Sequence, residues 1–145
     1  MAASMSSSDP PDGRGGPPVR VLAVDDQAVF LRAVRQLLRA APGFEQVGEA
    51  RSGAEAVERA SELRPDLVLL DVRMPGMDGI ETARRLLADP SPPAIVLISL
   101  EPLPDAGGTA DLPIAAFLRK QELSVRRLEA VWAEHRQEAG AHRGA

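Results

Sequence analysis

Five polar residues stand at the ends of short apolar runs, where a sheet could bring them together: Asp25, Asp26, Asp71, Ser99 and Lys120. Three crowded carboxylates raise the pKa of at least one of them unless a cation intervenes. An all-oxygen cluster without His or Cys suits a hard divalent ion, and a small open site that keeps waters suits Mg²⁺. A lysine and a hydroxyl could hold phosphoryl oxygens beside it. Such a set fits phosphoryl transfer, with an aspartate as nucleophile.

The lysine is set apart by composition. Of the 17 basic residues, 16 are arginines and only Lys120 is a lysine. A compact ammonium reaches into a pocket where the broad guanidinium fork fits poorly, so the two are not interchangeable there. We therefore interpret Lys120 as functional, with chance as the alternative.

Short apolar runs alternate with segments of helical period along the chain. The expected strands are 19–24, 44–50, 66–71, 94–100 and 115–119. Helices are expected after each of the first three strands and at the end of the chain, with Ser52 and Asp78 as two of the caps. This alternation predicts an α/β fold with a doubly wound, five-stranded parallel sheet. Ligands bind such sheets beyond the carboxyl ends of the strands, where the five polar residues are expected to converge.

One segment interrupts the alternation. Residues 101–113 should hold a fourth helix but contain three prolines and two adjacent glycines. A proline inside a helix costs about 3 kcal/mol. We expect a mostly irregular loop here, so that the fourth helix is degenerate.

Length and composition limit the class of protein. The chain has 145 residues, a net charge of −4 and no cysteine, which suits one domain without disulfides. We expect a disordered tail over 1–18, a folded domain over 19–138 and a C-terminal tail over 139–145. No secretory signal or membrane-spanning run is present, which favours a cytoplasmic protein. Mild acidity argues against a broad electrostatic contact with nucleic acid.

Residues 19 to about 138 resemble the receiver domain of bacterial response regulators. The resemblance rests on Asp25-Asp26, Ser99, Lys120 and above all the motif DVRMPGMDG that begins at Asp71. The stretches GFEQVGEARSGAEAVE and RPDLVLLD look most like receivers fused to a LuxR-type DNA-binding domain. The resemblance implies a flavodoxin-like sheet of strand order 2-1-3-4-5 and a protein that is a signalling module rather than an enzyme.

The resemblance also implies a metal-dependent phosphoacceptor. Asp71 would take a phosphoryl group from a histidine kinase or phosphotransfer protein of a two-component phosphorelay, giving an aspartyl phosphate. Mg²⁺ would be held by Asp25, Asp26, Asp71 and the backbone carbonyl of Arg73.

Further residues would act around the phosphoryl group. Ser99 and Lys120 would contact its oxygens, and Ser99 and Phe117 would form the switch, in which the ring turns inward as the hydroxyl moves. A core aromatic is the alternative for Phe117. Leu100 stands where the family normally has a small residue, so we expect it to act as an access gate that slows phosphorylation and hydrolysis.

The expected output is protein binding. Only 25 residues follow Lys120, whereas a DNA-binding domain needs on the order of 50–60. With a degenerate fourth helix, contact with an unidentified downstream protein, or a homodimer, should use another surface. The sequence thus favours a stand-alone receiver that switches partner binding.

Two alternatives come from other classes. A phosphorylation-independent interaction module with a receiver fold is favoured by the broken helix and Leu100, and opposed by the complete acidic cluster. A phosphatase of the haloacid-dehalogenase type also uses an aspartate nucleophile and Mg²⁺. It needs a second aspartate two residues after the nucleophile, where this chain has Arg73.

Overall fold

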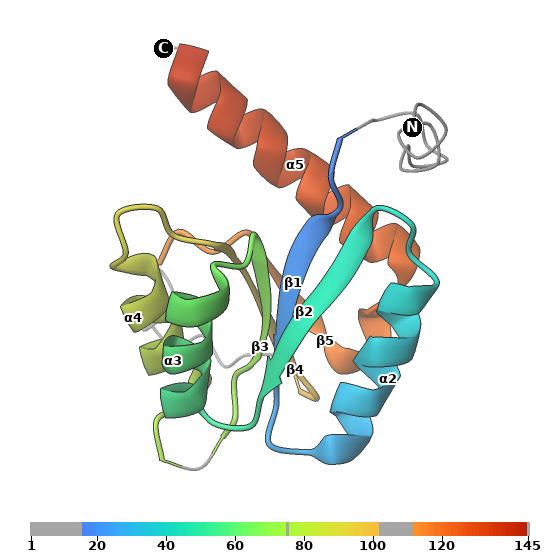
Figure 1. Cartoon of the computed structure of the whole chain (residues 1–145), viewed down its shortest axis with the longest axis vertical. Coiled ribbons are helices and arrows are strands. Elements are labelled where there is room, and N and C mark those ends of the chain that lie inside the picture. Colours follow the sequence, from blue (N-terminus) through green and yellow to red (C-terminus); the bar gives the residue numbers. More distant parts are fainter. Residues whose placement is uncertain (1–15, 75, 102–111, 145) are drawn as a thin grey trace, which may run out of the picture.

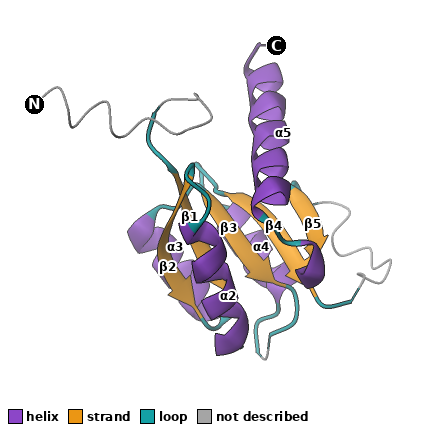
Figure 2. Ribbon diagram, turned by 90° about the vertical axis from the view of Figure 1, so that its right-hand side faces the viewer, coloured by secondary structure: helices purple, strands orange, loops and turns teal. Residues whose placement is uncertain are grey.

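The fold is described by a computed structural model for residues 16–74, 76–101 and 112–144. Five parallel strands form one sheet in the order β2-β1-β3-β4-β5 (Figures 1 and 2). They are β1 (Val19–Val24), β2 (Phe44–Ala50), β3 (Leu67–Asp71), β4 (Ala94–Ser99) and β5 (Ala116–Arg119). Every residue of β3 and β4 is buried, as expected for strands covered on both faces. The predicted fold class and strand order are confirmed.

Helices cover both faces of the sheet, two on each. The described part of the chain has α2 (Ala28–Arg39), α3 (Gly53–Leu63), α4 (Gly79–Leu87) and α5 (Val125–Gly144), with a 3-10 turn at Lys120–Glu122. Residues of α2 and α5 share one apolar core with the sheet, and residues of α3 and α4 share a second core on the other face (Figure 1). This arrangement buries the apolar side chains on both faces of the sheet.

The strand register aligns the carboxyl ends of the inner strands. Val24 lies opposite Leu70, so Asp25 and Asp71 each follow a matched position on neighbouring strands. Along β4, Ser99 lies opposite Arg119 of β5, which places Lys120 one residue beyond that pair. Parallel pairing thus brings residues up to 95 positions apart in the sequence to one edge of the sheet.

Two helix starts were correctly predicted from their caps. The Ser52 hydroxyl accepts a hydrogen bond from the backbone N–H of Glu55 at 3.1 Å. The Asp78 carboxylate accepts one from the N–H of Glu81 at 2.9 Å. Both bonds satisfy donors that a helix leaves unpaired at its first turn.

The strand limits differ from the expected ones by single residues at three ends. β3 begins at Leu67 instead of 66, β4 ends at Ser99 instead of 100, and β5 begins at Ala116 instead of 115. At the C-terminus, α5 continues to Gly144, through the expected domain limit at 138. The predicted tail over 1–18 falls almost wholly, and the predicted irregular loop over 101–113 largely, outside the described residues. Within the described ranges, no helix is long and apolar enough to cross a membrane.

Candidate functional site

Three carboxylates meet at the carboxyl edge of the sheet. Oxygens of Asp25, Asp26 and Asp71 lie within 4.8 Å of one another. Asp25 is fully buried and Asp71 is 6% exposed, whereas Asp26 is half-buried. Asp25 and Asp26 follow β1, and Asp71 ends β3, as the sequence predicted. Buried carboxylates this close need positive charge or hydrogen-bond donors around them.

Lys120 supplies positive charge to this cluster. Its Nζ lies 2.7 Å from Oδ2 of Asp25 and 3.9 Å from Oδ2 of Asp71, and its side chain is only 10% exposed. The Asp25 carboxylate is divided between two partners, because its Oδ1 accepts a hydrogen bond from the backbone N–H of Gln27 at 2.8 Å. One ammonium beside three carboxylates leaves the cluster with excess negative charge.

Burial and this excess negative charge both act on the pKa of Asp71. Burial and, next, the charge of Asp25 raise the pKa of Asp71 from 3.8 to about 6. A hydrogen bond from the backbone N–H of Arg73 to Oδ1, at 3.2 Å, and the charge of Lys120 act in the opposite direction. The metal-free cluster therefore resists carrying all three negative charges.

The donor set fits a small divalent cation. Its side-chain donors are all carboxylate oxygens, which suit Mg²⁺. Among the described residues, Oδ2 of Asp25 is a buried oxygen with no hydrogen bond of ordinary geometry, although it is ion-paired with Lys120. An oxygen with free lone pairs beside two further carboxylates is what a cation would use.

Ser99 reaches the same edge of the sheet from β4. It is 2% exposed, and its Oγ accepts a hydrogen bond from the backbone N–H of Glu101 at 3.2 Å. This bond uses a lone pair and leaves the hydroxyl proton available for another acceptor. The next residue, Leu100, is 59% exposed. Just outside, Arg73 and Glu101 form an ion pair at 3.4 Å whose side chains are both about two-thirds exposed.

Phe117 lies on β5 and is partly buried. It pairs with Leu97 across β4 and β5, and its partly buried side chain packs against the core shared by α3 and α4. This packing is that of an aromatic residue at the margin of the core, and the role of Phe117 as a switch stays a prediction.

The turn between β3 and α4 approaches the acidic cluster through a glycine. A Cβ on Gly79 would lie 2.3 Å from the carbonyl oxygen of Asp71 and 2.6 Å from Cα of Val72. Its N–H also donates to the carbonyl of Val72 at 2.8 Å. Only a residue without a side chain permits this approach. The motif DVRMPGMDG drew attention to the turn, but its spacing does not reveal this contact.

The sequence analysis missed Phe30. This residue of α2 places its ring centroid 4.4 Å from Nζ of Lys120. Its position four residues after Asp26 was the only available signal, and the helical pattern explained it equally well as a core residue.

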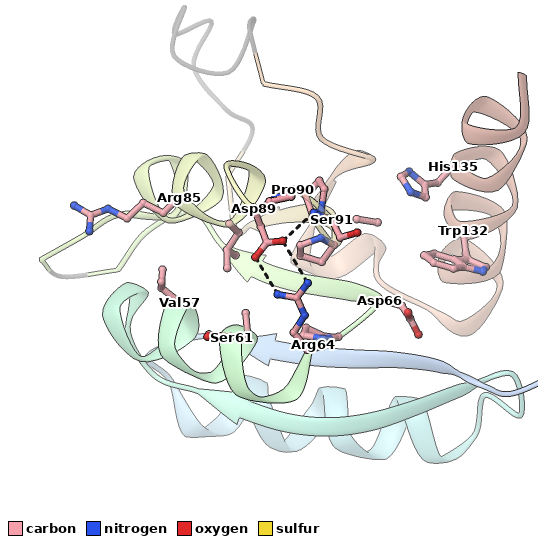
Figure 3. Close-up of a pocket in the computed structure, with 16 residues that line it drawn as sticks. Val57, Ser61, Arg64, Asp66, Arg85, Asp89, Pro90, Ser91, Trp132 and His135 are labelled. Atoms are coloured by element: carbon pink, nitrogen blue, oxygen red, sulfur yellow. Dashed lines mark hydrogen bonds and ion pairs between the residues drawn. The ribbon is translucent and has the colours of Figure 1, made fainter. Parts of the chain in front are cut away.

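A groove of about 630 Å³ lies away from these residues (Figure 3). Its walls are the C-terminal end of α3, the segment after α4 and one side of α5. Arg64 and Asp89 form a two-bond ion pair in it at 2.9 and 3.3 Å. Across the groove, the rings of Trp132 and His135 are stacked with centroids 5.6 Å apart. None of the five predicted site residues lines this groove.

Comparison with known proteins agrees with the fold. A family model described as the response regulator receiver domain matches residues 21–131. The chain belongs to this family, whose members act in two-component signalling.

Curated relatives include two protein-glutamate methylesterase/protein-glutamine glutaminases. That of Myxococcus xanthus (number 5) is 42% identical over 100 residues, covering 69% of this chain and 27% of the relative. That of Alkalilimnicola ehrlichii is 44% identical over 82 residues, covering 57% and 21%. The chain thus spans about a quarter of the length of these relatives, and the activities in their names are theirs.

Solved structures give the same family. The receiver domain of the putative response regulator NarL from Mycobacterium tuberculosis is 34% identical with a TM-score of 0.74, covering 81% of this chain and 96% of that one. The response regulator domain of Thermotoga maritima CheB is 28% identical with a TM-score of 0.69, covering 80% and 95%. Since the relatives include methylesterases, the predicted resemblance to the LuxR-linked subgroup is not confirmed.

Proposed function

We propose that this chain is a phosphoryl-accepting receiver, in which Asp71 takes a phosphoryl group from a histidine kinase or phosphotransfer protein. The observation that carries the proposal is the cluster of three carboxylates around the chain's single lysine, at the carboxyl edge of the sheet. Structural ion pairs do not explain it, because one lysine does not balance three carboxylates and the pKa of Asp71 is raised to about 6.

In the proposed transfer, a carboxylate oxygen of Asp71 attacks the phosphorus of a phosphohistidine. The new O–P bond forms as the P–N bond breaks, and the imidazole nitrogen keeps the electron pair and takes a proton from solvent. Asp71 must be ionised to attack, so its raised pKa is an obstacle that neighbouring positive charge reduces.

The surrounding residues would stabilise the charge on the phosphoryl oxygens. Lys120, now paired with Asp25 and 3.9 Å from Asp71, is close enough to move onto a phosphoryl oxygen. The hydroxyl group of Ser99 would donate a hydrogen bond to a second phosphoryl oxygen. Bound Mg²⁺, held by Asp25, Asp26, Asp71 and the carbonyl of Arg73, would supply further positive charge to these oxygens.

The output would be a change in partner binding. Movement of Ser99 toward the phosphoryl group, and of Phe117 into the space it leaves, is the proposed switch at β4 and β5. β5 is an edge strand and β4 is its neighbour, so a movement of these two residues could change the surface on that side of the sheet. The signal would pass either to a separate protein or to a methylesterase region like the one named in the two longer relatives.

The direct test uses the full chain with Mg²⁺ and a phosphohistidine donor. We expect one acid-stable, base-labile phosphoryl group per molecule, located on Asp71 by peptide mapping. Asp71→Asn should abolish this labelling. Asp66→Asn is the control: Asp66 is exposed and directly precedes the first residue of β3, so its substitution should leave the labelling unchanged. Equal labelling of both variants, or none in the wild type with several competent donors, would reject the proposal.

One alternative has an observation in its favour. Leu100, the residue after Ser99, is 59% exposed, and in this alternative a bound partner would cover it. A phosphorylation-independent interaction module would bind its partner equally well before and after treatment with beryllofluoride and Mg²⁺, and in Asp71→Asn.

A further inference from the structure

The ammonium of Lys120 is enclosed by three groups from three different elements. Asp25 follows β1, Asp71 ends β3, and Phe30 belongs to the first turn of α2. Nζ lies 2.7 Å from the first, 3.9 Å from the second and 4.4 Å from the ring centroid of the third. The carboxylates attract the charge, and the ring faces it without competing with them as a hydrogen-bond acceptor.

This arrangement matters because a lysine side chain is long and flexible. Its four-carbon stem permits many positions for the ammonium, and water is the usual competitor for its three donors. A ring face within about 6 Å attracts the charge, and does so more strongly where water is excluded. The Lys120 side chain is only 10% exposed, so the contact with Phe30 is of the desolvated kind.

Phe30 is fixed relative to the carboxylate that pairs with the lysine. The N–H of Gln27, the residue before α2, donates to Oδ1 of Asp25 at 2.8 Å. The N–H of Phe30 in turn donates to the carbonyl of Gln27 at 3.1 Å. Two hydrogen bonds therefore link Asp25, which pairs with the ammonium, to the backbone of the residue whose ring covers it.

We propose that Phe30 is a positioning residue for Lys120, holding its ammonium between Asp25 and Asp71 so that it can reach a phosphoryl oxygen. The role deepens the proposed phosphoryl-acceptor function and rests on it. Phe30 touches no reacting atom. It acts through the lysine, by closing the side of the ammonium that the carboxylates leave open.

The lone lysine makes the position of its ammonium directly measurable. In protein labelled with ¹³C,¹⁵N-lysine, the full chain gives a single set of ε-CH₂ signals, from Lys120. A ring face above this group shifts its protons upfield. We expect that shift in the wild type and in Phe30→Tyr, which keeps a ring face, and its loss in Phe30→Leu and Phe30→Met.

The same variants are compared in phosphorylation by phosphoramidate with Mg²⁺. We expect Phe30→Leu and Phe30→Met to react about tenfold more slowly than the wild type, and Phe30→Tyr to recover most of the rate. Two apolar replacements are used so that a failure of one to fold, seen in its amide spectrum, leaves the other.

Phe44→Leu is the matched control. Phe44 belongs to the same core as Phe30 but lies at the opposite edge of the sheet, at the start of β2. The Phe44→Leu variant should be less stable than the wild type. It should keep the upfield lysine shift, and its phosphorylation rate should stay within about twofold of the wild-type rate, well short of the tenfold loss expected for the apolar Phe30 variants.

Three results would overturn the proposal: no upfield shift in the wild type, an unchanged rate in the apolar Phe30 variants, or an equal loss in Phe44→Leu. A wild type that accepts no phosphoryl group would instead reject the phosphoryl-acceptor function. The lysine spectra would still decide whether Phe30 positions Lys120.

Discussion

At the scale of single residues, the site combines groups that destabilise the folded chain. Asp25 and Asp71 are both buried, and a single ammonium lies between them. Positive charge bound at the proposed metal site would recover the free energy lost to this crowding. Substitutions here should separate stability from activity.

Asp71→Asn should stabilise the metal-free protein at neutral pH. The pKa of Asp71 is about 6 when folded against 3.8 ordinarily, so its contribution to stability is present below about pH 4 and lost as the pH rises through 6. Asparagine does not titrate. We therefore expect the variant to gain about 2 kcal/mol at pH 7.5, discounted for the open side of the site, and about a third of that at pH 4.5. Urea unfolding with a chelator present measures both values, and an equal gain at both would contradict this origin.

Lys120→Arg should impair phosphorylation far more than folding. The ammonium occupies a space bounded by Asp25, Asp71 and the Phe30 ring, where a planar guanidinium must displace at least one of them. We expect a loss of at least about tenfold in the phosphorylation rate and about 1–2 kcal/mol in stability. Rates with phosphoramidate and urea midpoints give the two numbers. A normal rate would show that any cation serves here.

Leu100→Ala tests the proposed gate. Because the Leu100 side chain is 59% exposed, its removal should change stability by less than about 0.5 kcal/mol. If the side chain screens the approach to Asp71, both phosphorylation and hydrolysis should become faster. Stopped-flow fluorescence of Trp132, or radiolabel loss, would follow them. Unchanged rates of phosphorylation and of hydrolysis would show that Leu100 does not act as a gate.

At the scale of elements, the site depends on how closely α4 approaches the end of β3. Asp78 caps the helix, and Gly79 brings its first turn against the backbone of Asp71 and Val72. The glycine is thus a positional requirement of the site. Gly76, in the same turn, needs freedom of a different kind, since its φ is +78° and a Cβ there would meet no atom within 4 Å.

Gly79→Ala should be clearly worse than Gly76→Ala. The first must push apart backbone atoms that lie 2.3 and 2.6 Å from the new Cβ, and overpacking of this kind costs typically 1–3 kcal/mol or more. The second pays only for a left-handed backbone, about 1 kcal/mol. Urea unfolding measures the stabilities and isothermal titration the Mg²⁺ affinity. Equal losses would show that the close approach relaxes easily.

At the scale of the whole molecule, one edge of the sheet holds residues contributed by five parts of the chain. Carboxylates follow β1 and end β3, the hydroxyl ends β4, the lysine follows β5, and the ring comes from α2. A ligand at this edge binds only the folded arrangement. Binding there is therefore linked to global stability.

Mg²⁺ should stabilise the wild type and not Asp71→Asn. A ligand at ten times its dissociation constant adds about 1.4 kcal/mol, which corresponds to a rise in Tm of roughly 4–8 °C for a small domain. Thermal unfolding with and without Mg²⁺ checks the wild type, and Asp66→Asn is the control that should respond normally. An equal rise in Asp71→Asn would place the ion elsewhere.

Much of this architecture was predictable from local patterns. The apolar runs and helical periods gave β1 and β2 with their observed limits, and the Ser52 and Asp78 caps marked two helix starts. Strand ends were less certain, as with the single-residue differences in β3, β4 and β5, because the last paired residue depends on the neighbouring strand. The segment over 101–113 remains a sequence prediction.

The sequence by itself determined which residues come to the site, because strands of a parallel sheet end at a common edge and five polar residues stand at those ends. The tertiary structure decided how they share their contacts. The division of Asp25 between Gln27 and Lys120, the ring of Phe30 over the ammonium and the approach of Gly79 to Asp71 depend on helix rotation and spacing. These are set by packing between segments far apart in the chain, which no local pattern encodes.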